Sequence, residues 1–386
     1  MVLELSDRSP FKAIRVPISP AIAYWSVVDS DYRPFDLADE WLFHLRFGVD
    51  KAEGTTQNYA GCVAHYLNWA AAYGFDLVSA AEQLSRYVFF LDREVVTRGR
   101  GAGSHREGGR INGMLHAVRG LYRFGVTERV LPQSLLGVLY EVGDGPLLPM
   151  SLSGGRGLRM PARVRHSKRQ KTAPPVEAAS VDEWAALLGA ATRWRDRFLL
   201  LLPWVLGMRI GAVLGMRRSD LHFGPTRYGA TCLDGPHVHI VRRDNINRAS
   251  AKHGHGDRGL PVPGVVLEFY ERYLKERSAV PAAAWSDFVF VNLWHEPIGE
   301  PMKLHAIDPL LARLSTKAGL PHKISSHQFR HAAITRIAEN ESLEVAQEIA
   351  GHRHCTTTQR YNHPSDERLR RAVEMAPASL PAEEAE

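Results

Sequence analysis

The sequence predicts a mainly α-helical protein of the α+β class, with an N-terminal helical domain and a C-terminal, mostly helical domain that contains a small antiparallel sheet. Three observations lead to this prediction. Apolar residues recur at helical spacing over residues 35–142 and again after residue 180. A basic segment rich in proline and glycine separates these stretches. Residues 231–263 alternate between apolar and polar side chains as strands do. A length of 386 residues also favours two domains over one.

The composition is that of an ordinary globular protein with a basic balance. Hydrophobic residues make up 45% of the chain and charged residues 23%, and the formal net charge is +6, which favours an anionic partner. The three cysteines are far apart, which indicates a reducing compartment without a disulfide framework. No apolar run is long enough to span a membrane, and the N-terminus lacks the plan of a signal peptide. We therefore expect a cytoplasmic protein with no membrane partner.

The N-terminal half is expected to be an arm followed by five helices. Residues 1–34 contain four prolines and are predicted to be an extended arm that adds a short strand or wraps a neighbour. The helical domain spans residues 35–142. Its helices are expected at Phe35–Phe47, from Thr55 or Thr56 to Gly74, at Leu84–Val96, at Arg110–Phe124 and at Gln133–Val142.

Two basic segments are candidates for contact with phosphates. The loop at residues 98–109 is rich in glycine and arginine, and for it a solvated loop and a phosphate contact both stay open. Residues 143–179 form a basic linker between the domains, and we favour nucleic-acid contact there because such a segment releases counterions when it lies along a polyanion. The candidate DNA-binding residues are Arg100, Arg106, Arg110, Arg163, Arg165, Lys168, Arg169 and Lys171.

The C-terminal domain is predicted to span residues 180–376, followed by a disordered tail at 377–386. Ser180 and Glu183 form a capping-box pattern that opens the first helix. Arg209 follows an apolar helix, and the sequence offers it no carboxylate between Asp196 and Asp220, so an anion is its expected partner. The other expected elements are strands at 237–241, 260–262 and 287–291 and helices at 265–277 and 307–318.

A metal site is not expected. His253 and His255 lie in the turn that also contains Lys252, and two histidines at that spacing can be metal ligands. No cysteine or carboxylate cluster supports them, so we predict neither a metal nor another cofactor.

A cluster of polar residues near the C-terminal end has the most distinctive spacing in the chain. Ser325 and Gln328 are expected to form a capping box, which places His327 and Arg330 on one face of the first helical turns. A second helix over residues 343–350 is stopped by Gly351. His352 follows at once, and Tyr361 comes nine residues later, after a threonine-rich turn.

The order H-x-x-R-H, then G-H, then tyrosine resembles the signature of the tyrosine recombinases, the phage integrase family. The G-M-R-I motif of residues 207–210 resembles the first arginine motif of that family, and Lys252 lies in a hairpin where the family keeps its lysine. The helical domain at 35–142 resembles the family's core-binding domain.

The resemblance implies a role for each of six candidate catalytic residues. Arg209 and Arg330 would hold the non-bridging oxygens of the scissile phosphate. Tyr361 would be the nucleophile, and because the free tyrosine pKa is about 10 it needs a base, for which His327 is the family's candidate. The remaining two are His352, which would donate a hydrogen bond to a phosphate oxygen, and Lys252, which would protonate the departing 5′ oxygen.

The resemblance also implies the reaction and the partners. A 3′-phosphotyrosyl bond replaces a phosphodiester of similar energy, so neither a metal nor ATP is required. The partners would be a double-stranded DNA recombination site and other copies of the chain in a synaptic tetramer, with the protein at the bacterial nucleoid when it is bound to DNA. Our first hypothesis is therefore a site-specific recombinase or integrase, and we favour a mobile genetic element as its context.

One departure from the family pattern keeps alternatives open. The family usually has an acidic residue three positions after its first arginine, where this chain has Ala212. This motivates a second hypothesis, a catalytically weakened relative that only binds DNA. A third is a type IB topoisomerase-like strand transferase, against which His327 argues because those enzymes generally have lysine at that position.

Overall fold

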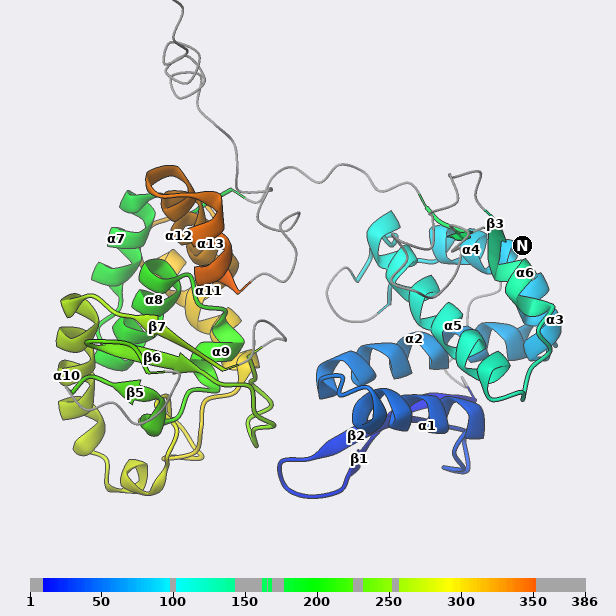
Figure 1. The fold of residues 1–386 in the computed structure, drawn as a ribbon, viewed down its shortest axis with the longest axis horizontal. Coiled ribbons are helices and arrows are strands. Elements are labelled where there is room, and N and C mark those ends of the chain that lie inside the picture. The colour runs from blue at the N-terminus through cyan, green and yellow to red at the C-terminus, as the bar shows by residue number, and fades with distance from the viewer. Residues whose placement is uncertain are drawn as a thin grey trace, which may run out of the picture. The chain divides into compact units, whose positions relative to one another are not determined.

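The computed structural model of the chain divides into two compact units, one up to Pro174 and the other from Pro175 onward (Figure 1). It describes residues 10–97, 102–142, 162–164, 166–168, 177–224, 232–251 and 257–351. Both units are mainly helical, as the sequence predicts, and both contain small antiparallel sheets, whereas the sequence predicts a sheet only in the second. The division between the units falls inside the predicted linker at residues 143–179.

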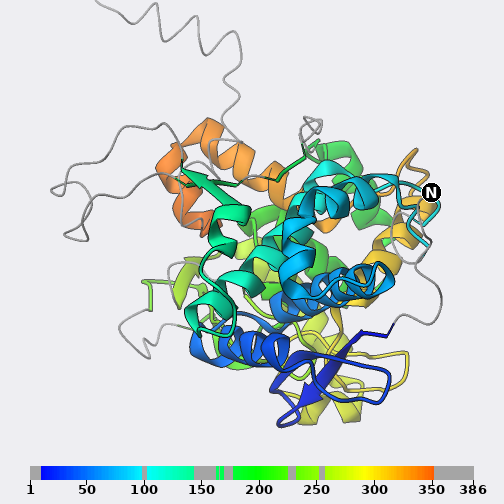
Figure 2. The ribbon, with the colours of Figure 1, turned by 90° about the vertical axis from the view of Figure 1, so that its right-hand side faces the viewer.

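In the first unit, the described part of the predicted arm, which was expected to add a short strand or wrap a neighbour, forms a β-hairpin. Strands β1 (Lys12–Pro17) and β2 (Ala23–Val28) pair antiparallel, with Lys12 opposite Val28. The hairpin is drawn in dark blue in Figure 2. It is tied to the helices because the side chain of Asn68 accepts a hydrogen bond from the Phe11 backbone and donates one to its carbonyl. The described part of the predicted arm is therefore part of the folded unit.

The helices of the first unit pack around an aromatic core. Trp69, Tyr66, Tyr87 and Tyr122 are fully buried, and the hydroxyl groups of Tyr66 and Tyr122 are 2.7 Å apart. The helices are α1 (Asp36–Phe43), a π-helical turn η1 (His44–Gly48), α2 (Glu53–Ala72), α3 (Leu77–Glu82), α4 (Leu84–Arg93), α5 (Gly108–Thr127) and α6 (Leu135–Leu139).

Three details of this unit differ from the sequence-based expectation. Helix α2 begins at Glu53, so Thr55 and Thr56 lie inside the helix and cap nothing. Helix α3 was not expected, although Asp76 caps it through the backbone N–H of Ser79. The predicted fifth helix is shorter, because residues 140–142 form β3 (Tyr140–Val142), which pairs with β4 (Ala162–Val164) inside the predicted linker.

The second unit contains most of the expected helices. The capping box of Ser180 and Glu183 is confirmed at the start of α7. The helices are α7 (Val181–Ala190), α8 (Trp194–Leu206), α9 (Ile210–Leu214), α10 (Gly264–Ser278), α11 (Ile307–Lys317), α12 (Ser326–Asn340) and α13 (Leu343–Ala350), with 3₁₀ turns η2 (Arg218–Asp220), η3 (Pro281–Trp285) and η4 (Leu304–Ala306).

A three-stranded antiparallel sheet completes the second unit. Its order is β5 (Leu221–His222), β6 (His237–Ile240) and β7 (Arg258–Pro261). Strand β5 was not predicted because it is only two residues long. Residues 287–291, predicted as a strand, form isolated bridges from Phe288 to Arg217 and from Val291 to Pro301. None of the described helices has the length and apolarity that crossing a membrane requires.

Candidate phosphate-binding site

Arg209 is positioned by the end of helix α8. Gly207 adopts a left-handed conformation with φ of 60°, which ends α8, and α9 begins just after Arg209. A Cβ atom on Gly207 would lie 2.7 Å from Cδ1 of Ile334 on α12. Only glycine permits both this backbone conformation and this close approach, so the glycine of the G-M-R-I motif lets the chain pack against α12 two residues before Arg209.

Arg330 lies on the second turn of α12, and its side chain is only 2% exposed. The capping box of Ser325 and Gln328 is confirmed at the start of this helix, where the Ser325 N–H donates to Oε1 of Gln328 at 2.8 Å. The guanidinium of Arg330 donates to the carbonyl of Gly207 and, at 2.8 Å, to the carbonyl of Ala350. One buried arginine thus joins the end of α8 to the end of α13.

Three arginines converge on the C-terminal end of α13. Arg330 and Arg209 both donate to the Ala350 carbonyl, at 2.8 and 3.5 Å. Arg258 on β7 donates to the carbonyl of Glu348 and, at 2.8 Å, to that of Ile349. The last carbonyls of a helix have no partner within it and form the negative end of its dipole, so they attract and orient cations.

Burial and the charges of nearby residues shift the pKa of Arg258. Burial lowers the pKa of Arg258 most, the negative charge of Glu348 raises it, and the positive charge of Arg209 lowers it. Arginine nevertheless remains protonated in proteins. The junction of α8, α12, α13 and β7 is therefore a concentration of fixed positive charge.

The segment that precedes Lys252 is packed directly against α9. A Cβ atom on Gly211 would lie 2.8 Å from the carbonyl oxygen of Ser250, and one on Gly215 would lie 2.9 Å from that of Ala249. The buried side chain of Asn247 donates to the carbonyls of Leu214 and Met302, both at 2.9 Å. Residues 247–250 are thereby fixed beside the helix that begins after Arg209.

The predicted catalytic residues divide into three groups. Arg209 and Arg330 are brought together, as described above. His327 lies in the first turn of α12 with an exposed side chain. Lys252, His352 and Tyr361 lie outside the described residues, although the chain is described up to Ala251 before Lys252 and up to Gly351 before His352.

Arg209 was expected to bind an anion because no carboxylate lies near it in the sequence, and three residues test this expectation. Asp196 and Asp220 are both engaged with other arginines: Asp196 with Arg195 at 2.8 Å, and Asp220 with Arg243 at 2.7 Å. Ala212, at the position where the family usually has an acid, packs against the hydrophobic core of the unit. Its backbone N–H donates to the Arg209 carbonyl at 2.8 Å.

The candidate DNA-binding residues of the first unit have different surroundings. Arg106 donates to the Glu94 carboxylate and lies 3.3 Å from Nε2 of His65, with its side chain 13% exposed. Arg110 is exposed and donates to Oδ1 of Asn58 at 2.8 Å.

Lys168 pairs with Asp92 at 2.9 Å, and its backbone exchanges two hydrogen bonds with the Asn112 side chain. Arg163 lies on β4, where only the backbone is described. The remaining candidates, Arg100, Arg165, Arg169 and Lys171, lie outside the described residues.

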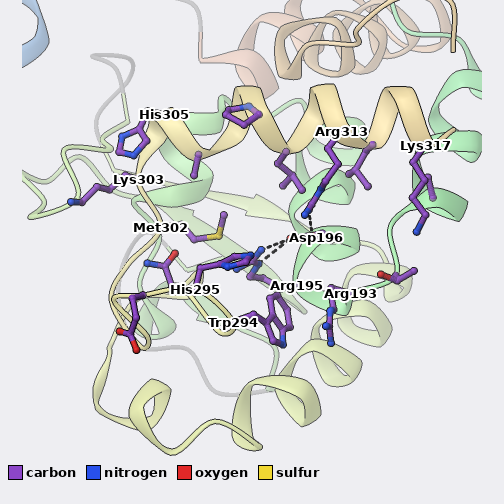
Figure 3. A pocket seen from close by; sticks show the side chains of 18 of the residues that line it. Arg193, Arg195, Asp196, Trp294, His295, Met302, Lys303, His305, Arg313 and Lys317 are labelled. Atoms are coloured by element: carbon purple, nitrogen blue, oxygen red, sulfur yellow. Dashed lines mark hydrogen bonds and ion pairs between the residues drawn. The ribbon is translucent and has the colours of Figure 1, made fainter. Parts of the chain in front are cut away.

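A cavity of about 710 Å³ lies elsewhere in the second unit, beneath α11 (Figure 3). Among the described residues, those that line it include none of the six predicted catalytic ones. Its buried charges are Arg195 and Asp196, which pair with each other, and the Arg195 guanidinium also stacks 4.5 Å from the centre of the Trp294 ring. Because this ion pair is internally satisfied, we interpret it as part of the scaffold.

Sequence reasoning missed one cluster of polar residues, on the sheet of the second unit. Each residue of this cluster offers one ligand atom, and these atoms all lie within 4.8 Å of one another; the residues are His222, Cys232, His237 and His239. Burial most of all, and then the neighbouring imidazoles of His222 and His237, lower the pKa of His239, which favours its neutral ring. The signal that could have found the cluster is H-x-H on a strand, because positions i and i+2 share one face.

The fold is that of a class of DNA strand-transfer enzymes, as comparison with known proteins shows. Residues 179–368 match the model of the phage integrase family. This part of the chain belongs to that family, the tyrosine recombinases.

Relatives and solved structures agree with this assignment. The chain is 26% identical over 337 residues to tyrosine recombinase XerD of Corynebacterium glutamicum, covering 86% of this chain and 95% of the relative. It is 26% identical over 219 residues to transposase A from transposon Tn554 of Staphylococcus aureus, covering 56% of this chain and 55% of the relative.

Two solved structures show the same fold at low identity. One is the XerH site-specific recombinase bound to palindromic difH substrate, with a TM-score of 0.52, 16% identity and 88% of each chain covered. The other is the Tn1549 transposon integrase in complex with transposon right end DNA, with a TM-score of 0.51, 16% identity, and 78% of this chain and 85% of that chain covered.

Proposed function

We propose that the protein is a site-specific recombinase, or integrase, of a mobile genetic element, which cleaves and rejoins double-stranded DNA through a 3′-phosphotyrosyl intermediate. The observation that carries the proposal is the convergence of Arg209, Arg258 and Arg330 on the last carbonyls of α13, directly before His352. The relatives that include a transposase and a transposon integrase favour the mobile-element context.

The arginines would bind the scissile phosphate. Carbonyl oxygens hold Arg209 and Arg330 in fixed orientations, and these contacts carry no net charge, so they orient the guanidinium groups without cancelling their charge. A phosphate that is attacked by a nucleophile gains negative charge on its non-bridging oxygens, and preorganised donors stabilise that charge without reorganising. His352 would donate a further hydrogen bond to one of these oxygens.

The chemical step is a transesterification. The Oη atom of Tyr361 attacks the phosphorus, and its proton passes to His327. The bond between phosphorus and the 5′ oxygen breaks, and Lys252 donates the proton that makes this oxygen a hydroxyl group. Attack by the 5′ hydroxyl of a partner strand on the phosphotyrosine reverses the step and joins two different strands. The energy of the phosphodiester is conserved, so the reaction uses neither Mg²⁺ nor ATP.

The two units would share the work of binding DNA. Residues 35–142 would contact one face of the duplex as a core-binding domain, and the basic linker at 143–179 would follow its phosphates. Residues 180–376 would form the catalytic domain. Exchange of strands between two sites needs four active sites, so we propose a tetramer assembled on DNA.

The test is a covalent-adduct assay on a nicked suicide duplex made from the DNA that flanks the gene. Wild-type protein should form an adduct that survives denaturing electrophoresis, in buffer without Mg²⁺ or ATP, and Tyr361→Phe should form none while it still binds the duplex. The matched control is Tyr270→Phe, a partly buried tyrosine that packs on Phe198 in the same unit. Adducts formed by Tyr361→Phe would contradict the nucleophile assignment.

The same assay separates the alternatives. A relative that only binds DNA would form no adduct with wild-type protein and would not relax a supercoiled plasmid. A topoisomerase-like strand transferase would relax plasmids of any sequence, whereas a recombinase should require the flanking DNA.

A further inference from the structure

We propose that His222, Cys232, His237 and His239 bind one zinc ion, which links Cys232 to strands β5 and β6. The site lies on the sheet of the second unit, outside the phosphate-binding junction, and the proposal does not depend on the proposed function. Imidazole nitrogens and a thiolate are the donors that Zn²⁺ prefers, and four such ligands make a closed, structural site.

The topology of the sheet places three of the four ligands on one face. His222 on β5 lies directly opposite His237 on β6 in the antiparallel register. His239 is two residues further along β6 and therefore points to the same side as His237. Cys232 comes from the connection between the two strands. Figure 1 shows β5, β6 and β7 as neighbours in this unit.

Three of the six separations between ligand atoms fit a tetrahedral ion, and all six are within 4.8 Å. With Zn–N of about 2.0–2.1 Å and Zn–S of about 2.3 Å, the edges of the tetrahedron are about 3.3 Å between nitrogens and about 3.6 Å between nitrogen and sulfur. The distance from Nε2 of His237 to Nε2 of His239 is 3.2 Å. The Sγ atom of Cys232 lies 3.4 Å from Nδ1 of His222 and 3.6 Å from Nε2 of His239.

Backbone carbonyls orient two of the rings for metal binding. Nδ1 of His237 donates to the carbonyl of Gly235 at 2.8 Å. The lone pair is then on Nε2, the ring nitrogen that faces the cluster. Nε2 of His222 donates to the carbonyl of Ser219 at 3.1 Å, which leaves Nδ1 facing Cys232. A hydrogen bond from the outer ring nitrogen to a carbonyl is the usual support of a metal-bound histidine.

Hydrogen bonds between the four side chains are the competing explanation. A proton on Nε2 of His239 can satisfy His237, and the Cys232 thiol can satisfy His222. Such hydrogen bonds join the side chains in pairs, whereas the ligand atoms of all four side chains lie within 4.8 Å of one another. His237 and His239 are also buried, at 1% and 9% exposed, so their ring nitrogens need partners other than bulk water.

An ion here would support the junction indirectly. On the sheet, Ile240 at the end of β6 is paired with Arg258 on β7, and Arg258 holds the last turn of α13. The ion would fix β6 against β5, and β7 is bonded to β6. All four ligand positions are taken by protein atoms, so the ion would have a structural role.

The first measurement is the metal content of the full-length protein purified without a metal-affinity step, by mass spectrometry of the elements. We expect one zinc per chain. Removal by a chelator should lower the thermal midpoint, and added Zn²⁺ should restore it. Added Co²⁺ should give visible ligand-field bands of a tetrahedral site and a near-ultraviolet thiolate-to-cobalt band. Protein with only traces of zinc, no such bands and no thermal shift would overturn the proposal.

Variants locate the site within the chain. Cys232→Ser should lose the thiolate-to-cobalt band and bind zinc at least about 10-fold more weakly, and His239→Asn should also weaken binding. The matched control is Cys62→Ala, which removes a buried cysteine from the other unit and should keep the band. Full zinc content in Cys232→Ser would contradict the assignment.

A measurement on wild-type protein covers the case in which these variants fail to fold. Alkylation by iodoacetamide, mapped by mass spectrometry, should modify Cys232 in the zinc-free protein and spare it after Zn²⁺ is added. Equal modification in both states would overturn the proposal.

Discussion

Two buried arginines of the second unit, Arg330 and Arg195, are held in opposite ways. Arg330 is 2% exposed and donates to the carbonyls of Gly207 and Ala350. Arg195 is 7% exposed and donates twice to the carboxylate of Asp196, at 2.9 and 2.8 Å. A carboxylate neutralises the arginine that it holds, whereas a carbonyl only orients it. Arg195 is thus paired with a carboxylate of the scaffold, whereas Arg330 is oriented by carbonyls, and we propose that its charge binds an anion.

The largest expected effect is on the scaffold side of this comparison. Arg195→Ala leaves the Asp196 carboxylate, 2% exposed, without the two N–H donors to its Oδ1 and with Arg313 only at 3.8 Å, and breaking a buried pair in this way costs about 3–5 kcal/mol of unfolding free energy. Urea denaturation measures it. The double variant Arg195→Met/Asp196→Leu should recover most of the loss. A cost below about 1 kcal/mol, the range of a surface pair, would show that the two arginines are not different in kind.

The next effect is on the phosphate side. Arg330→Lys keeps a positive charge but loses the planar fork that reaches two carbonyls, and we expect strand cleavage to fall about 10²–10³-fold, as when one transition-state donor is removed. The single-turnover rate of adduct formation measures it. Arg336→Lys is the matched control, since Arg336 lies on the same helix and donates to the Trp204 carbonyl at 2.9 Å. Equal losses in both variants would indicate a general effect on α12.

A smaller effect is expected at Gly207, which ends α8 and packs closely against α12. Gly207→Ala introduces a Cβ atom 2.7 Å from Ile334 at a φ of 60°, and we expect a loss of about 1–3 kcal/mol of unfolding free energy. Adduct formation should fall as well, because Arg209 follows two residues later. Gly113→Ala on α5 is the control: nothing lies within 4 Å of its Cβ position, so it should be neutral or slightly stabilising.

The smallest effect extends the comparison to the first unit. Burial raises the pKa of Glu94 most, but the contacts with His65 and Arg106 outweigh it, so the pKa lies below its ordinary value. A carboxyl whose pKa is lowered by folding contributes stability above its unfolded pKa and loses that contribution as the pH falls through the folded pKa. Arg106→Gln should therefore cost about 1–2 kcal/mol at neutral pH and less in acid.

DNA binding distinguishes the two roles of these arginines. If Arg106 belongs to the scaffold, the salt dependence of DNA affinity should be unchanged in Arg106→Gln. Arg110→Gln, which alters an exposed arginine, should reduce the salt slope by about one unit. A reduced slope for Arg106→Gln at full stability would assign it to DNA contact instead.

The predictions from sequence are confirmed where an element depends only on residues close together in the chain. The helices α5, α10 and α11 lie within a few residues of their predicted bounds because their apolar faces recur at helical spacing. The capping boxes at Ser180 and Ser325 are confirmed because both partners lie three residues apart. Residues 287–291 were predicted as a strand and form only isolated bridges, since their apolar run packs into the core without a neighbour strand.

The parts that were missed depend on contacts between distant segments. Arg209 and Arg330 were singled out by motif, but their meeting on Ala350 requires the ends of α8 and α13 to lie beside the second turn of α12. Arg258 carried no motif, and only the sheet places it at the end of α13. The histidine–cysteine cluster was missed because His222 joins His237 only through strand pairing.

The most direct test of the central claim is to map the residue that becomes joined to DNA. Adduct from the suicide duplex would be digested with protease and nuclease, and the peptide that carries a residual nucleotide identified by tandem mass spectrometry. The account predicts a nucleotide joined through its 3′ phosphate to Tyr361. A nucleotide on any other residue would contradict the account, as would an adduct that is equally abundant in the Arg330→Lys variant.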